Sequence, residues 1–228
     1  MKSEVKGIIF DYGGTLDTGG CHWGRLCWHV YRQHRVPVTE QQFREAYVHA
    51  ERALGRESII KPGDTFRQTL ATKVKLQLEA LNVAPDVGET LVSDLYLTAQ
   101  RHTAHSREVL RRLRQRFPLV LVSNFYGNLS TVLREFQLDG LFVHVVESAA
   151  VGIRKPDARI FQLGVEALGL QPGEVVVVGD SVKNDIVPAQ TLGCRTVWLQ
   201  GEGWTDAVPH EVPAQHVITD IKELVTII

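Results

Sequence analysis

The sequence predicts an α/β fold in which a doubly wound parallel sheet carries an inserted helical domain. From Ser106 to the end of the chain, short apolar runs alternate with stretches of helical spacing, which is typical of a parallel sheet with helices on both faces. Between Thr18 and about His105 the chain lacks continuous β-branched runs and contains long amphipathic stretches instead. We therefore expect a Rossmann-like core formed by residues 1–17 and 106–228, and a helical cap formed by residues 18–105.

Short, mainly apolar runs predict the strands of the core. Their length and their content of Val, Leu and Ile suit strands that are buried on both faces. These runs comprise residues 7–10, 119–122, 143–146, 175–178 and 196–199. Stretches of helical spacing lie between or after them: one helix begins with Ser106 as its N-cap residue and ends before Phe117-Pro118, and others cover residues 157–168, 185–192 and 221–228.

The cap segment predicts a bundle of about four helices. Amphipathic stretches cover residues 41–53 and 66–81, and turn signals interrupt the segment at Val36-Pro37, at residues 61–64 and at residues 84–86. Because the segment follows the first strand, we expect it to lie over the ends of the strands, where it could act as a lid.

The composition indicates a soluble protein that acts on small ligands. The chain has 228 residues, of which 44% are apolar, and a formal net charge of −1. This charge gives no reason to expect binding to nucleic acid or to a membrane surface, and no segment has the pattern of a membrane span or a signal peptide. The three cysteines, Cys21, Cys27 and Cys194, form no metal-binding spacing and cannot all pair, so we expect a cytoplasmic protein.

Polar residues follow the predicted strands at the points where they end. Asp11 follows the first strand, Ser123-Asn124 the second and Asp180 the fourth, while Lys155 lies in a loop between them. Because parallel strands bring their carboxyl ends to one edge of a sheet, these residues should converge. Clustered carboxylates bind Mg²⁺, a carboxylate beside that ion can attack phosphorus, and a hydroxyl and an ammonium group can hold the phosphoryl oxygens.

The motifs that contain these residues resemble, in order and spacing, the four motifs of the haloacid dehalogenase-like hydrolase superfamily. The resemblance extends from Lys6 to about Leu199, and the helical insertion matches the position and size of the family's type 1 cap. The four motifs are Asp11-x-Gly-Gly-Thr15, Val122-Ser123-Asn124, Gly152-Ile153-Arg154-Lys155-Pro156-Asp157 and Val178-Gly179-Asp180-Ser181-x-x-Asn184-Asp185.

The resemblance implies a role for each of these positions. Asp11 is expected to be the nucleophile and Asp180 a Mg²⁺ ligand, while Ser123 and Lys155 hold the phosphoryl group. Asp185 is expected to support Lys155 or the waters of the metal. Two further residues of the same motifs are expected at the site, namely Asn124 beside Ser123 and Thr15 in a supporting role.

Gly13 departs from the family pattern. Phosphatases of the family usually carry a second Asp here, which protonates the leaving group and later activates water, and whose backbone carbonyl binds the metal. A glycine supplies that carbonyl equally well, but it removes general acid/base catalysis, which is typically worth about 10²–10⁴ in rate. The cap offers substitutes, since His22 and His29 follow soon after the motif, and Trp23 could also face the site although its spacing favours packing within the cap.

Three functions remain open from the sequence. We favour Mg²⁺-dependent hydrolysis of a small phosphomonoester through an aspartyl-phosphate. A 2-haloacid dehalogenase would use Asp11 to attack carbon without a metal, and Asp180 and Asp185 argue against it because such a reaction gains little from further carboxylates. A non-catalytic protein that binds a phosphorylated ligand or a partner through the cap is the third reading, and Gly13 is its main support.

Overall fold

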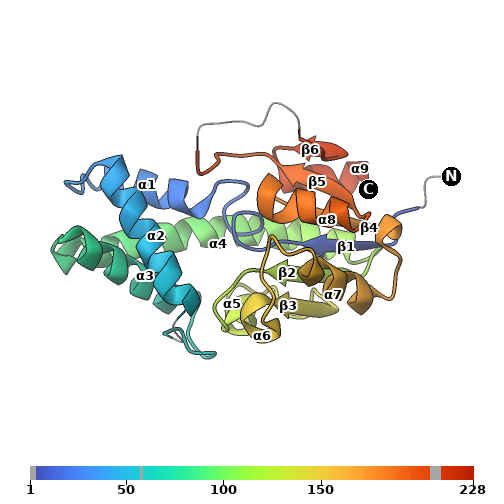
Figure 1. The fold of residues 1–228 in the computed structure, drawn as a ribbon, viewed down its shortest axis with the longest axis horizontal. Coiled ribbons are helices and arrows are strands. Elements are labelled where there is room, and N and C mark those ends of the chain that lie inside the picture. Colours follow the sequence, from blue (N-terminus) through green and yellow to red (C-terminus); the bar gives the residue numbers. More distant parts are fainter. Residues whose placement is uncertain (1–3, 57–58, 206–211) are drawn as a thin grey trace.

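A sheet of six parallel strands forms the centre of the core (Figure 1). The computed structural model describes residues 4–56, 59–205 and 212–228. The strands lie in the order β3-β2-β1-β4-β5-β6, and every neighbouring pair is parallel. Their bounds are β1 Gly7–Phe10, β2 Leu119–Ser123, β3 His144–Glu147, β4 Val175–Gly179, β5 Arg195–Leu199 and β6 His216–Ile218.

The expected α/β fold is therefore confirmed, with one strand more than the apolar runs predict. Strand β6 has only three residues, and His216 and Val217 are exposed. A short edge strand with one buried side chain leaves no apolar run in the sequence. The strand order reverses at β1, which lies between β2 and β4, and in open parallel sheets ligands bind at the carboxyl ends of the strands beside such a point.

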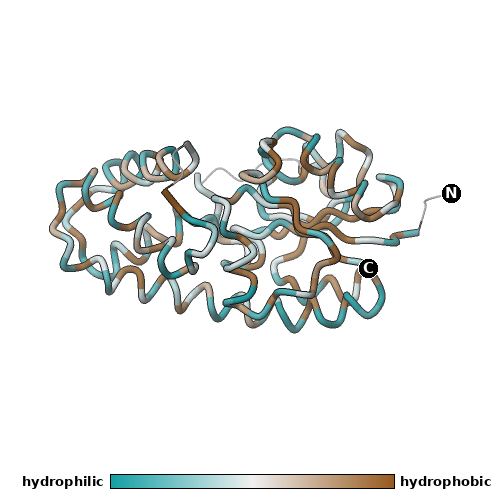
Figure 2. Tube along the Cα trace, turned by 90° about the horizontal axis from the view of Figure 1, so that it is seen from below, coloured by the Kyte–Doolittle hydropathy of each residue, from teal (hydrophilic) through white to brown (hydrophobic). Residues whose placement is uncertain are grey.

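Alternate residues of the central strands pack against helices on opposite faces of the sheet. Ile8 and Phe10 of β1 belong to one apolar cluster and Ile9 to another. The first cluster includes residues of α5 (Leu129–Glu135) and α9 (Leu224–Ile227), and the second includes residues of α7 (Arg159–Leu168) and α8 (Val187–Thr191). Figure 2 shows the hydrophobic stretches gathered along the strands inside the core.

Four helices form the bundle that the cap segment predicts, and the bundle lies beyond the carboxyl ends of the strands, although α4 also continues along the sheet (Figure 1). They are α1 Trp23–Gln33, α2 Glu40–Arg56, α3 Phe66–Leu81 and α4 Gly88–Leu113. Among the described residues, no helix has the length and apolar character of a membrane span.

The predicted helix start at Ser106 is wrong, because Ser106 lies within the continuous helix α4. Its side chain is buried, and its hydroxyl donates a hydrogen bond to the backbone carbonyl of Leu16 at 2.8 Å. A serine can occupy a helix interior when its hydroxyl finds such a partner, and here the partner lies in the loop that follows β1. Helix α4 thus runs along both the four-helix bundle and the sheet (Figure 1), and the boundary expected between residues 105 and 106 falls inside it.

Candidate active site

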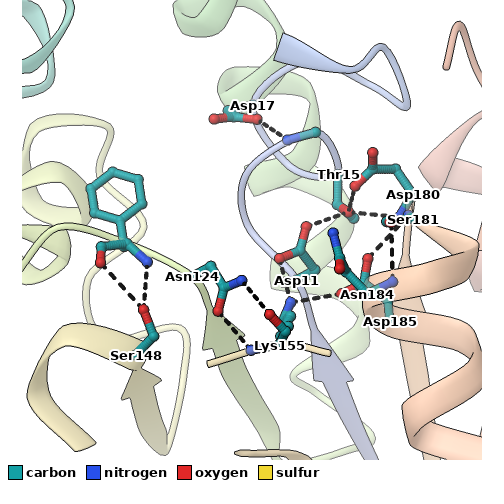
Figure 3. A network of polar contacts seen from close by, with 12 residues as sticks. Asp11, Thr15, Asp17, Asn124, Ser148, Lys155, Asp180, Ser181, Asn184 and Asp185 are labelled. Atoms are coloured by element: carbon teal, nitrogen blue, oxygen red, sulfur yellow. Dashed lines mark hydrogen bonds and ion pairs between the residues drawn. The ribbon is translucent and has the colours of Figure 1, made fainter. Parts of the chain in front are cut away.

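Asp11 lies at the centre of a group of polar side chains at the carboxyl ends of β1, β2 and β4 (Figure 3). It directly follows β1, Ser123 is the last residue of β2 and Asp180 directly follows β4. The sequence therefore brings these residues together as expected, because neighbouring parallel strands end at the same edge.

Lys155 joins two carboxylates in the interior of this group. Its ammonium lies 2.6 Å from Asp11 Oδ1 and 2.7 Å from Asp185 Oδ1, and all three side chains are almost fully buried. Burial alone acts to lower the pKa of Lys155, but the two carboxylates outweigh it and raise that pKa above its usual value. The lysine is thus a fixed positive charge beside the expected nucleophile.

Thr15 connects Asp11 to Asp180. Its hydroxyl lies 2.8 Å from Asp11 Oδ2 and 3.1 Å from Asp180 Oδ1, and it accepts a hydrogen bond from the backbone N–H of Asp180 at 3.0 Å. The loop that carries Thr15 passes close to Asp180, because a Cβ added at Gly14 would lie 2.5 Å from Asp180 Oδ1 and the backbone there has φ +99°. Only glycine suits this position.

Three carboxylates of this group offer the ligand set of a divalent cation. Oxygen atoms of Asp11, Asp180 and Asp185 all lie within 4.8 Å of one another. Burial, with the nearby Asp11 and Asp185 carboxylates, raises the pKa of Asp180 well above its usual range, and burial raises the pKa of Asp185 to about 6. Crowded, buried carboxylates of this kind favour a bound cation that offsets their charge, and oxygen ligands suit Mg²⁺. The residues present therefore fit the expected metal.

The side-chain amide of Asn124 holds the loop that carries Lys155. Its Oδ1 accepts a hydrogen bond from the Lys155 N–H at 2.9 Å, and its Nδ2 donates to the Lys155 carbonyl at 3.2 Å. Ser123 is buried beside it, and both side chains line the same cavity as Asp11. Asn124, which directly follows β2, thus fixes the backbone of Lys155, whose ammonium contacts Asp11 (Figure 3).

A cavity of about 470 Å³ opens above Asp11, between the strand ends and the helical bundle. At one end it is lined by the polar group just described, and Gly13 lies beside that group. At the other end it is lined by His22, at the start of α1, and by a segment after β5 that includes Gln200, Trp204 and Thr205. Of the three cap residues singled out in the sequence, His22 alone is among the described lining residues.

His29 and Trp23 have other partners. His29 is exposed, and its Nε2 lies 2.6 Å from Glu202 Oε2. The indole N–H of Trp23 donates to Asp17 Oδ2 at 2.9 Å, and its ring packs against Phe66. The packing expected for Trp23 is therefore confirmed, with its ring edge 3.9 Å from the position of a Cβ at Gly13.

Asp17 is a buried acid that the motif reading overlooked. Its Oδ1 accepts a hydrogen bond from the Gly14 N–H at 2.7 Å, and its Oδ2 accepts the one from Trp23. Burial raises the pKa of Asp17 to about 7. It does not line the cavity, so it supports the loop after β1 from beneath. The sequence holds little signal for it, because residues 13–20 are rich in Gly and Thr and resemble an ordinary polar loop.

Comparisons with known proteins agree with this geometry. Residues 5–193 match the family profile described as haloacid dehalogenase-like hydrolase. The chain is 30% identical over 205 residues to a phosphoglycolate phosphatase of Vibrio vulnificus, covering 87% of this chain and 85% of the relative. It is 28% identical over 135 residues to a glyceraldehyde 3-phosphate phosphatase of Pyrococcus furiosus, covering 58% of this chain and 56% of the relative. The chain thus spans about half the length of that relative.

Solved structures show the same fold at low sequence identity. A dehalogenase aligns with a TM-score of 0.66 at 19% identity, covering 100% of this chain and 99% of the other. A phosphatase from Thermococcus onnurineus aligns with a TM-score of 0.58 at 21% identity, covering 98% of this chain and 97% of the other. Both similarities concern the fold alone, because one fold carries different reactions.

Proposed function

Because the chain belongs to the haloacid dehalogenase-like hydrolases, we propose that it is a Mg²⁺-dependent phosphatase that hydrolyses a small phosphomonoester through a phosphorylated Asp11. The observation that carries this proposal is the group at the strand ends in which the buried Asp11, Asp185 and Lys155 lie beside the half-buried Asp180. Phosphatases among its relatives support the same class of reaction.

The side chains at this end of the cavity supply what phosphoryl transfer requires. Asp11 and Asp180, with Asp185 beside them and the Gly13 carbonyl as a further expected ligand, would hold Mg²⁺, which supplies positive charge to the phosphoryl oxygens when bound. A carboxylate oxygen of Asp11 forms a bond to phosphorus as the bond between phosphorus and the leaving oxygen breaks. The leaving oxygen keeps the electron pair of the broken bond. Lys155 and Ser123 hold the phosphoryl oxygens, so charge is stabilised where it develops.

The leaving group departs without help from a neighbouring carboxylate. Position 13 has no side chain, and Asp17 is occupied by Gly14 and Trp23 outside the cavity. Burial lowers the pKa of His22 to about 4, so its ring is neutral at pH 7 and donates a proton poorly. His22 therefore acts on the leaving group as a hydrogen-bonding and packing partner, while the exposed His29 takes no part.

The dehalogenase reading rests on the same nucleophile, and the crowded carboxylates disfavour it. A metal-free attack on carbon would leave Asp180 half-buried beside two buried carboxylates without an ion to offset its charge. The non-catalytic reading rests on Gly13, yet Lys155 and Thr15 still engage both oxygens of Asp11. Two strong contacts to one carboxylate suit a nucleophile held in a fixed orientation.

The purified protein should be incubated with a panel of phosphate esters and 2-haloacids, with and without Mg²⁺, beside the Asp11→Asn variant. We expect phosphate release that requires both Mg²⁺ and Asp11, with a loss of about 10³-fold or more in the variant. Halide release without metal would establish the dehalogenase instead. No activity on the phosphate esters or the 2-haloacids, with retained binding of phosphorylated compounds, would show that the protein is a non-catalytic binding protein.

A further inference from the structure

The segment that follows β5 closes the far end of the cavity by docking on the cap. The backbone N–H of His22 donates to the Glu202 carbonyl at 2.8 Å, and Arg44 Nη1 donates to the Trp204 carbonyl at 2.7 Å. In Figure 1 the chain leaves β5 and runs toward α1. This end of the cavity therefore has two walls, one from the cap and one from the core.

Trp204 is held in place by contacts on several sides. Its ring centroid lies 5.1 Å from those of His22 and Tyr47, and the Arg44 guanidinium lies 4.3 Å from its centre. A Cβ added at Gly24 would lie 2.1 Å from the indole ring, which shows that the ring rests directly on the backbone of α1. Gly24 is thus required for this position of Trp204.

His22 adds a neutral ring to the cavity wall beside the indole. Its Nδ1 accepts a hydrogen bond from the Gly24 N–H at 3.0 Å, so the neutral ring carries its proton on Nε2. Among the described lining residues, the acids all belong to the phosphoryl end, and Lys155 is held there by two carboxylates. Lys183 also lines the cavity, with its side chain exposed. The wall formed by His22 and Trp204 therefore presents aromatic rings to the cavity, and the nearest charge on it is the Arg44 guanidinium that packs on the indole.

We infer that Trp204 and His22 form a leaving-group subsite for a flat, uncharged ring whose phosphate is borne on an unsaturated carbon, as in aryl phosphates. The inference rests on the proposed phosphatase function and names its substrate class. Stacking favours a flat ring over a puckered one of equal size. An aryl oxygen also leaves as a stable anion, which agrees with the absence of a carboxylate at Gly13. Shape and chemistry thus point to the same class of ester.

Binding of two phosphonates, which the enzyme cannot hydrolyse, separates stacking from leaving-group chemistry. Phenylphosphonate and cyclohexylphosphonate have rings of similar size, and calorimetry in the presence of Mg²⁺ gives the dissociation constant of each. We expect the flat ring to bind about fivefold more tightly, as one or two aromatic contacts predict. Equal affinities in the unmodified protein would overturn the inference.

Two variants should remove this preference by different routes. Trp204→Leu deletes the ring, whereas Gly24→Ala retains the ring but displaces it from the backbone of α1. Both variants should bring the affinities for the two phosphonates to within about twofold of each other. Gly55→Ala is the control for Gly24→Ala: its Cβ would meet only Arg154, at 3.9 Å, so this variant should keep the preference. A preference that survives in Trp204→Leu or Gly24→Ala would contradict the subsite.

Phosphonoacetate, as a third ligand, tests whether the subsite prefers a charged leaving group. If phosphonoacetate binds more tightly than phenylphosphonate, and Lys183→Ala abolishes that advantage, the leaving group carries a carboxylate and the inference is wrong. Failure of the subsite alone would leave Asp11-dependent phosphate release intact. Loss of binding by all three phosphonates, together with no phosphate release from any ester, would overturn the proposed function as well.

Discussion

The two ends of the cavity differ in how their side chains are held and in how much charge they carry. At the phosphoryl end, Asp11, Asp185 and Lys155 are buried and joined by short ion pairs, and Asp180 lies beside them. At the leaving-group end, His22 and Trp204 are neutral and held by ring contacts. The difference suggests that the chain fixes the chemistry of transfer at one end and selects its substrate at the other.

Lys155→Met should have the largest effect on stability, because it removes the cation that pairs with two carboxylates at the phosphoryl end. It leaves two buried carboxylates without their cation, which typically lowers the free energy of unfolding by about 3–5 kcal/mol. Lys6→Met is the matched control, since Lys6 also pairs with a carboxylate at 2.6 Å but is exposed. Chemical denaturation without added metal should show a large loss for the first variant and none for the second. Equal losses would contradict the buried pairing.

Gly13→Asp should add, beside the phosphoryl end, an acid that can assist the leaving group. A Cβ here would contact only Trp23, at 3.9 Å, so the side chain can be accommodated. If the missing proton donor limits the reaction, the rate with alkyl phosphates should rise by up to about 10²-fold, with less gain for aryl phosphates. Gly13→Asn has a similar size and no such proton, and it should give no gain. An equal rise in both variants would show that size, rather than proton transfer, matters.

Asp17 provides a pH test of the loop that follows β1. Its pKa is raised to about 7 in the folded protein from about 4 in the unfolded chain, so the folded state holds a proton that the unfolded state releases in this range. The contribution of Asp17 to stability is therefore greatest below pH 4 and falls as the pH rises to 7, by up to about 1.4 kcal/mol per pH unit.

Denaturation of the unmodified protein and of Asp17→Asn across this pH range measures how the free energy of unfolding changes with pH. The stability of the unmodified protein relative to the variant should decrease with rising pH between about 4 and 7. A constant difference would show that Asp17 is ionised in the folded protein throughout, held by the N–H groups of Gly14 and Trp23.

His29→Ala should have the smallest effect. The side chain is exposed and pairs with Glu202 away from the cavity, so turnover should change by less than about twofold. His22→Ala, by contrast, removes a lining ring and should raise KM for aryl phosphates. Steady-state kinetics on one aryl ester compares the two. A larger loss in His29→Ala would reverse the assignment of the two histidines.

The sequence predicts the phosphoryl end well, because that end depends on topology. Once the apolar runs are placed in a parallel sheet, Asp11, Ser123 and Asp180 must meet at the strand ends. The leaving-group end depends on contacts between segments far apart in the chain. Nothing in the sequence around Trp204 indicates that its ring rests on Gly24, because the two residues lie far apart in the chain.

Local sequence patterns also gave wrong predictions for residues whose hydrogen-bonding partner lies far away in the chain. Ser106 resembles an N-cap, but its hydroxyl bonds to Leu16 and the helix continues through it. His29 resembles a candidate acid by its position after the first motif, but α1 directs it toward Glu202. In each case the partner lies 90 or more residues away, beyond what local spacing can reveal.

The central claim is that Asp11 carries the phosphoryl group during turnover. Acid-quenching the protein while it hydrolyses an aryl phosphate with Mg²⁺, followed by mass spectrometry of its peptides, tests this most directly. We predict one phosphoryl group on the peptide that contains Asp11, absent from the Asp11→Asn variant. Sustained Asp11-dependent turnover with no phosphoryl group on that peptide, under conditions where an acyl phosphate survives the quench, would contradict the account.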